Sequence, residues 1–508
     1  MRCSIALALV GVVTACGSKQ PQSAAPPVSA PRASAIPMSD PAEYAIDRIS
    51  REAGQAIFER TGIGDPYRTG VPYPVFLALQ RAYPELLGKD PQELADKFGF
   101  VARAPDPSSP DPDRREGLPI GLHLTTDPLT GVSFLMTACA ACHSERLRWP
   151  GGEAVIIGLG NKRVRIHAYD RAFAQVTRAP GFSAAKLGVL ATEAATAKQL
   201  VWPVPYRDAI TDATVGALVT RAAERRSLHA RTTDDPPGRV ATIESFALVL
   251  SQLTGKPIDT APVIGWAKVP DVIGYAQRTT LSWDGSGEGP IDLLAVEADI
   301  AAGVRIEWIE KHPFQGASLG AYLRQPAPRP AFPRAIDRTL AARGKVLFAD
   351  QCAHCHGTYA SDGRVTDYTE QIVPNADLRV DPARMMAATE SFERAANDPD
   401  LTRGYTKFRR STGYVPPILT NVWARAPYGH VGQWPSLAVL AMQPDRRPVK
   451  FTVDYEALYD LDAVGVSTAG TSGHVHDGSR AGFSVGGHPF LADLGADARA
   501  VIEYLKTL

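Results

Sequence analysis

The sequence predicts a mainly α-helical protein in which two domains of the same type are joined and surrounded by extensive loops. Three observations support this prediction. The pattern Cys-x-x-Cys-His occurs twice, at residues 139–143 and 352–356. Apolar residues recur at helical spacing just before the second copy and at the C-terminus. The chain also contains 43 glycines and 42 prolines, more than the average globular protein, and these residues favour loops.

Each motif is the attachment pattern of c-type haem. Two cysteines three residues apart on a turn can each form a thioether with one haem vinyl group, and the histidine that follows can ligate the iron. The sequence therefore predicts two covalently bound haem c groups. The predicted attachment residues are Cys139, Cys142, Cys352 and Cys355. The predicted proximal iron ligands are His143 and His356.

A zinc knuckle or a thioredoxin-like redox pair is the alternative interpretation of these motifs. Zinc would require four converging ligands, and the histidine after each cysteine pair would then have no fixed role. We therefore favour haem at both motifs.

The two remaining cysteines lie near the N-terminus. Cys3 precedes an apolar run, Ile5–Val13, that is too short to span a bilayer and is typical of a signal peptide. The run ends at Val13-Thr14-Ala15-Cys16, which resembles a bacterial lipobox, so Cys16 is the predicted lipidation site. An ordinary secretory signal cleaved nearby is the alternative. We expect an exported protein, lipid-anchored in the periplasm, and Gly17 favours the outer membrane over the inner one.

Composition and motif positions divide the chain into five predicted segments. These are a lipoprotein signal peptide (1–15), a disordered tether (16–44), an N-terminal haem domain with insertions (45–324), a proline-rich linker (325–334) and a C-terminal cytochrome c domain (335–508).

Apolar spacing predicts the helices within these segments, over 46–58, 74–83, most of 183–253, 336–348 and 498–508. A polar, proline-rich loop is predicted over 104–115. The basic run at 221–226 is interpreted as a solvated helix face.

Charge excludes one class of partner. The 54 basic and 54 acidic residues give a formal net charge of zero, whereas a nucleic-acid-binding protein needs a basic surface. The expected partners are a redox protein or a small-molecule oxidant, together with the membrane that holds the lipid anchor. After the signal peptide, no stretch of 18 apolar residues predicts a transmembrane helix.

The C-terminal third of the chain resembles the bacterial di-haem cytochrome c peroxidase superfamily, and most closely its rubber-oxygenase (RoxA-like) type. The residues that carry the resemblance are Ala327–Phe348, Trp423–Leu437, Gly487–Phe490 and Tyr504–Leu508. The first motif, Gly158–Asn161 and Trp283–Ser286 are matched more sparsely. The sequence departs from the family pattern at Gly429, Val431 and Gln433, which surround His430.

The resemblance implies two class I cytochrome c-like haem domains. In such a domain the first helix, here over 336–348, is crossed by the C-terminal helix, with small residues such as Gly344 at the contact. It also implies that His430 is the distal ligand of the second haem, which would then be saturated by two histidines.

Other sixth ligands stay open at this point. The competitors of His430 are Met442, Met385, Met386 and Tyr414. The histidines nearest to the first motif, His123 and His167, are interpreted as structural, which would leave the first iron five-coordinate. His474 and His476 form a weaker metal-binding pattern in a Gly/Ser-rich loop.

Three functions follow from these alternatives. The first is an oxidoreductase in which one haem reacts with peroxide or dioxygen and the other relays electrons. The second is a non-catalytic periplasmic electron-transfer lipoprotein with both haems six-coordinate. The third is a sensor whose open haem takes up a small gas. The catalytic residues themselves are not predicted by the sequence.

Overall fold

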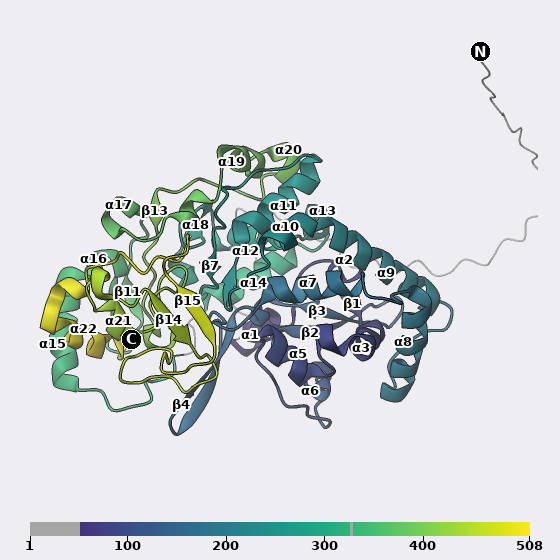
Figure 1. Cartoon of the computed structure of the whole chain (residues 1–508), viewed down its shortest axis with the longest axis horizontal. Coiled ribbons are helices and arrows are strands. Elements are labelled where there is room, and N and C mark those ends of the chain that lie inside the picture. Colours follow the sequence, from purple (N-terminus) through teal and green to yellow (C-terminus); the bar gives the residue numbers. More distant parts are fainter. Residues whose placement is uncertain (1–50, 326–328) are drawn as a thin grey trace, which may run out of the picture. The chain divides into compact units, whose positions relative to one another are not determined.

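The computed structural model describes residues 51–325 and 329–508 (Figure 1). The predicted signal peptide, Cys16 and the predicted tether lie outside the described residues. In the part of the chain that the structure describes, no helix has the length and apolar character needed to cross a membrane.

Fifteen helices precede the second motif in the described residues. They are α1 (Arg51–Arg60), α2 (Pro66–Thr69), α3 (Tyr73–Ala82), α4 (Pro84–Leu87), α5 (Pro91–Phe98), α6 (Pro112–Glu116), α7 (Ile166–Val176), α8 (Ala184–Lys198), α9 (Arg207–Glu224), α10 (Arg226–Arg231), α11 (Thr242–Thr254), α12 (Ile291–Ala301), α13 (Ile306–Lys311), α14 (Phe314–Arg324) and α15 (Arg338–Gln351). Those that follow are α16 (Ala353–His356), α17 (Asn375–Leu378), α18 (Ala383–Met386), α19 (Glu390–Ala396), α20 (Pro399–Thr402), α21 (Leu437–Leu440) and α22 (Ala498–Leu505).

The strands are short and all pair antiparallel. They are β1 (Val71–Pro72), β2 (Leu122–Thr126), β3 (Ser133–Thr137), β4 (Ser144–Trp149), β5 (Gly152–Ile157), β6 (Arg239–Val240), β7 (Ala267–Lys268), β8 (Thr280–Leu281), β9 (Gly287–Glu288), β10 (Thr358–Tyr359), β11 (Val365–Asp367), β12 (Val373–Pro374), β13 (Gly413–Tyr414), β14 (Lys450–Val453) and β15 (His474–Asp477). One sheet has three strands in the order β1-β3-β2, and the others are two-stranded pairs.

The helices predicted from apolar spacing are confirmed where the structure describes them, as α1, α3, α8 to α11, α15 and α22. The predicted loop over 104–115 ends earlier, because α6 begins at Pro112. Asp111 precedes this helix and its side chain accepts a hydrogen bond from the amide of Asp113.

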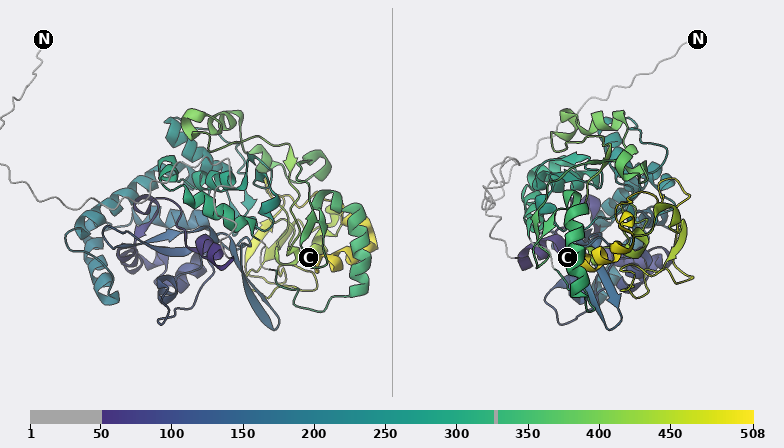
Figure 2. Two further views of the ribbon diagram at one scale, coloured as in Figure 1. Left: turned by 180° about the vertical axis from the view of Figure 1, so that it is seen from behind. Right: turned by 90° about the vertical axis from the view of Figure 1, so that its left-hand side faces the viewer.

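The crossing of α15 and α22 follows from side-chain size. The side chain of Asp337 caps α15 by accepting a hydrogen bond from the amide of Leu340. Midway along α15, a Cβ built on Gly344 would lie 1.8 Å from the carbonyl oxygen of Ala500, so a larger residue would push the helices apart. The two helices lie side by side in both Figure 1 and Figure 2, and α15 leads directly into the second motif.

The basic run at 221–226 is not simply a solvated face, as the sequence suggested. Arg221 and Arg225 both pair with the buried Asp170 of α7, at 2.8 and 3.2 Å, and His229 contacts the same carboxylate at 2.7 Å. Against the opposing effect of burial, the charges of Arg225 and Arg221 and the contact with His229 hold the pKa of Asp170 well below its usual range. The interpretation failed because the buried partner is 51 residues away in the chain.

The hairpin β4–β5 starts directly after the first motif, at Ser144, and turns after Trp149. Figure 1 shows it as a long ribbon labelled β4. Its inward residues Leu147 and Ile156 are buried in one apolar cluster with Trp423 and other residues of the C-terminal third. The hairpin therefore connects the first motif to the core that surrounds the second.

Candidate haem sites

The second motif forms the turn that follows α15. Cys352 and Cys355 are partly buried and are not joined in a disulfide. The Nδ1 atom of His356 lies 2.8 Å from the carbonyl oxygen of Pro417. Because a carbonyl accepts but cannot donate, Nδ1 carries the proton and Nε2 keeps its lone pair, which is the state in which imidazole binds a metal.

A cavity opens beside this motif. The cavity has a volume of about 190 Å³, and it is lined by Cys352, Cys355 and His356. Most of the wall is apolar and includes Leu378, Val380, Leu437, Leu440, Val501 and Leu505. An apolar cavity edged by two thiols and a histidine with a free nitrogen fits covalently attached haem.

His488 faces His356 across this cavity. Their ring centres are 6.2 Å apart. Metal–nitrogen bonds of about 2 Å, with about 1 Å more from each nitrogen to its ring centre, place two imidazoles on one iron about 6 Å apart. His488 is not among the ligands predicted from the sequence.

The backbone and the ionisation of His488 also indicate a functional role. His488 has a φ of 45°, in the left-handed region that residues with side chains rarely adopt, and such strain is concentrated at functional sites. Its amide donates to the carbonyl oxygen of Leu378 at 2.7 Å, which holds this conformation. Its Nδ1 is buried without a hydrogen-bond partner among the described residues. Burial, with His356 nearby, lowers the pKa of His488 to about 3, so the ring is neutral and able to ligate.

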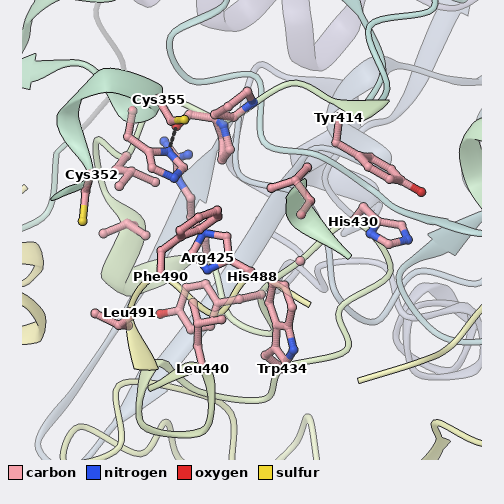
Figure 3. A pocket seen from close by; sticks show the side chains of 18 of the residues that line it. Cys352, Cys355, Tyr414, Arg425, His430, Trp434, Leu440, His488, Phe490 and Leu491 are labelled. Carbon is pink, nitrogen blue, oxygen red and sulfur yellow. Dashed lines mark hydrogen bonds between the residues drawn. The ribbon is translucent and has the colours of Figure 1, made fainter. Parts of the chain in front are cut away.

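His430, the ligand implied by the family resemblance, also lines the cavity but packs differently. Its ring stacks on Tyr414 with a centre-to-centre distance of 4.5 Å, and its Nδ1 lies 3.5 Å from the side-chain nitrogen of Gln433. Figure 3 shows His430 beside Tyr414, away from Cys352 and Cys355. Burial lowers the pKa of His430 to about 3, so this ring is neutral as well.

The other competitors for the second iron are less well placed. The hydroxyl of Tyr414 donates to the carbonyl oxygen of Asp381 at 2.7 Å. Met386 and Met442 are exposed, Met385 packs against the apolar cluster, and none of the three lines the cavity.

The first motif repeats the backbone hydrogen bonds of the second, because in both the amides of the second cysteine and of the histidine donate to the carbonyl oxygen of the first cysteine. Residues Cys139–Ala141 form a 3-10 turn, and the Nδ1 of His143 lies 2.9 Å from the carbonyl oxygen of Pro270. Gly121 packs directly against this turn, where a Cβ would lie 1.9 Å from the amide nitrogen of Ala141. Two thiols and a histidine with a free Nε2 therefore fit a second haem c here.

The surroundings of His143 differ from those of His356. The ring that contacts His143 belongs to Phe58, at 6.3 Å between centres, and a phenyl ring has no atom that can ligate iron. All eleven histidines lie in the described residues, and none of the others makes a ring contact with His143 there. His167 uses its Nε2 to accept the amide of Ala241 at 3.0 Å, and His123 pairs with Asp113 at 2.7 Å.

Three acids on α12 are buried, Asp292, Glu297 and Asp299, and Asp299 lies close to Cys139 of the first motif. Asp299 is 4% exposed. Burial raises its pKa to about 7. Burial, with a smaller contribution from Asp299, also raises the pKa of the Cys139 thiol. Glu297 is similarly buried and its pKa is raised to about 8 by burial. The sequence signal for these residues, acids within the apolar stretch 291–301, was missed.

One segment contacts both sites. Pro270 accepts the hydrogen bond of the first motif histidine, and its neighbour Asp271 pairs with the buried Arg425 of the second cavity at 3.2 Å. Trp283, which lines that cavity, donates its indole N–H to the carbonyl oxygen of Lys268 at 2.8 Å. Trp283 therefore links the wall of the second cavity to the segment that orients the first histidine.

His474 and His476 both lie on β15. His476 is buried, stacks on Phe451 at 4.8 Å and has its Nε2 2.8 Å from the carbonyl oxygen of Phe483. Among the residues that the structure describes, no cluster of three or more histidine, cysteine or acidic side chains is arranged to hold a metal ion.

Comparison with known proteins agrees with the geometry of the second site. Residues 413–452 match the family model described as RoxA-like, cytochrome c-like, and these residues include Tyr414, His430 and Trp434 of the cavity wall. The chain is also similar to "Uncharacterized protein y4iM" of Sinorhizobium fredii (strain NBRC 101917 / NGR234), with 29% identity over 290 residues. This alignment covers 47% of the chain and 64% of that protein. A cytochrome c-like domain implies covalently bound haem c. The segment 413–452, which forms part of the wall of the second cavity, is thus similar to a RoxA-like, cytochrome c-like domain.

Proposed function

We propose that the chain is a di-haem c-type cytochrome oxidoreductase, in which the first haem reacts with peroxide or dioxygen and the second relays electrons. An asymmetry between the two motif histidines supports the proposal. His356 faces a second histidine at the spacing of two imidazoles on one iron, whereas His143 faces Phe58 at nearly the same distance. His356 and His488 would together hold the iron of the second haem, whereas His143 would hold the iron of the first haem beside Phe58.

The proposal assigns the sixth ligand of the second haem to His488. The ring spacing, the left-handed backbone and the unpartnered Nδ1 favour His488, whereas the ring of His430 is stacked on Tyr414. His430 stays the alternative ligand. Neutral imidazoles on both faces suit a haem that changes its charge by one electron without exchanging ligands.

Haem at the first site supplies an iron that exchanges single electrons and binds a small oxidant at an open position. The chain supplies the surroundings for that chemistry. Phe58, Ile120 and Leu319 belong to the apolar cluster around the motif and exclude water from it. We assign the proton donor to Asp299, because it is buried close to Cys139 and burial raises its pKa to about 7, so that it can both bind and release a proton near neutral pH.

Trp283 is proposed as the contact through which electrons pass between the two sites. It lines the second cavity and is hydrogen-bonded to the segment 268–271, which also holds the first motif histidine.

The location and partners follow from the same proposal. Haem c is attached outside the cytoplasm, and the lipobox-like sequence that ends at Cys16 supports lipid anchoring after export. The expected electron partner is a redox protein or a small-molecule oxidant. Nucleic acid is not an expected partner, because the formal net charge of the chain is zero.

The test uses the haem-loaded protein and two double variants. Cys139→Ser with Cys142→Ser removes the first attachment site, and Cys352→Ser with Cys355→Ser removes the second. We expect two haems per wild-type chain and one in each variant, measured as pyridine haemochrome. Peroxide consumption should be lost in the first variant, whereas the second should bind peroxide but lose turnover with an electron donor. Equal peroxide consumption by both variants would contradict the assigned roles.

A further inference from the structure

Four aromatic side chains form a continuous path away from the second cavity. Tyr428 lines the cavity, and its hydroxyl oxygen lies 3.4 Å from that of Tyr459. The ring of Tyr459 lies 6.2 Å from that of Trp423, and Trp423 lies 6.4 Å from Trp149, with both pairs packed edge to face.

The path ends at the surface. Tyr428, Tyr459 and Trp423 are buried, whereas Trp149 is partly exposed at the end of β4, beside the exposed turn at 150–151. Trp149 is six residues from His143 along an extended strand, a separation of about 20 Å at the usual rise of a strand. The path therefore belongs to the second haem site and not to the first.

The polar contacts of this path decide which rings can lose an electron. The hydroxyl of Tyr459 donates to the carbonyl oxygen of Trp423, and that of Tyr428 lies 3.2 Å from the carbonyl oxygen of Val464. A tyrosine that loses an electron must also release its proton, and a carbonyl oxygen is too weak a base to accept it. An indole can lose an electron while it keeps its N–H. The two tryptophans therefore hold the positive charge, and the tyrosines bridge Trp423 to the cavity.

We propose that Trp149 is a second oxidation site, where a phenolic donor too large to enter the cavity gives up an electron. This inference rests on the proposed function, because the reaction with peroxide supplies the oxidising power. One peroxide takes up two electrons and two protons and becomes two waters. Each electron leaves Trp149 along the path, and a phenol returns it while releasing one proton to solvent. Two phenols therefore supply both the electrons and the protons that one peroxide consumes.

The test is oxidation mapping of the haem-loaded protein after treatment with hydrogen peroxide in the absence of a donor. Peptide mass spectrometry should find oxygen added to Trp149, because its charge is not quenched, and an added phenol should suppress this adduct. Trp202 and Trp308 are partly exposed tryptophans outside the path and serve as internal controls. Equal oxidation of all three would mean attack from solvent and would overturn the proposal, as would an unmodified Trp149.

Variants test the path by a second readout. Trp149→Phe should lose the oxygen adduct at this position. It should also oxidise a polymer-bound phenol more slowly, relative to free phenol, than the wild type does. Trp308→Phe should match the wild type in the adduct at Trp149 and in the ratio of the two rates. Trp423→Phe should lower oxidation of Trp149. If that variant lacks the wild-type haem spectrum, Tyr459→Leu breaks the same path.

The outcomes separate this proposal from the proposed function. If the protein consumes peroxide and Trp149 is not oxidised, the second oxidation site is wrong and the proposed function stands. If the protein does not consume peroxide, both fail.

Discussion

The most direct energetic consequence of the first site concerns Asp299. Burial raises the pKa of its carboxyl from 3.8 to about 7. Because the folded state binds this proton more tightly than the unfolded chain, the stabilising contribution is complete below about pH 4 and is lost as the pH rises through 7. At about 1.36 kcal/mol per pKa unit, ionisation of the buried group between pH 5 and pH 8 destabilises the wild type by about 3 kcal/mol.

Asp299→Asn cannot ionise and should not show this loss. The free energy of unfolding of the variant, relative to wild type, should therefore increase by about 3 kcal/mol between pH 5 and pH 8. Glu297 has the same sign of dependence but is present in both proteins, so its effect cancels in the difference. The measurement is urea unfolding of the haem-loaded protein by far-UV circular dichroism. Asp212→Asn, at an exposed position on α9, is the control. Its free energy of unfolding relative to wild type should be the same at pH 5 and pH 8.

A catalytic readout separates the proton-donor role from stability alone. The rate of peroxide reduction by wild type should fall as the pH rises above 7. Asp299→Asn should be slower by roughly 10²-fold or more, and its rate should not fall in this pH range. A stability difference that is the same at pH 5 and pH 8 would refute the argument that burial keeps this carboxyl protonated.

Three further predictions test other parts of the account. His488→Ala should convert a low-spin haem into one that binds cyanide, seen by absorption spectroscopy, whereas His430→Ala should leave that haem low-spin; the reverse result would assign the ligand to His430. Trp283→Phe should slow electron transfer between the haems in stopped-flow reduction with both haem spectra preserved, and an unchanged rate would exclude this contact. Gly344→Ala should lower stability by about 1–3 kcal/mol through the clash between α15 and α22. Gly216→Ala, a helical glycine with open space around its Cβ position, should instead stabilise by about 0.5–1 kcal/mol, and a similar thermal shift for both variants would be inconsistent with the packing described.

The sequence predicts the features that are local. The spacing of cysteines and histidine in each motif predicts haem attachment, and apolar periodicity predicts α15, which leads into the second motif, and α22 at the C-terminus. The contact of Gly344 with α22 was implied by the family resemblance, and the structure confirms it.

The features that depend on long-range contacts could not be predicted in this way. His488 is 132 residues from His356, and its left-handed backbone is visible only after the chain has folded back onto the cavity. His430 lies within Trp423–Leu437, a segment that resembles the family pattern, and for that reason it was the predicted distal ligand of the second haem. The environment of Asp299 likewise depends on what packs around α12, although an acid in an apolar helix was a signal that could have been followed.

The central claim, one open iron and one iron with two histidine ligands, is tested most directly by electron paramagnetic resonance of the oxidised, haem-loaded protein with and without cyanide. The account predicts one high-spin signal that becomes low-spin on addition of cyanide, and one low-spin signal that cyanide does not change. Two low-spin signals that both ignore cyanide, in the oxidised and the half-reduced protein, would contradict it and would indicate an electron carrier instead.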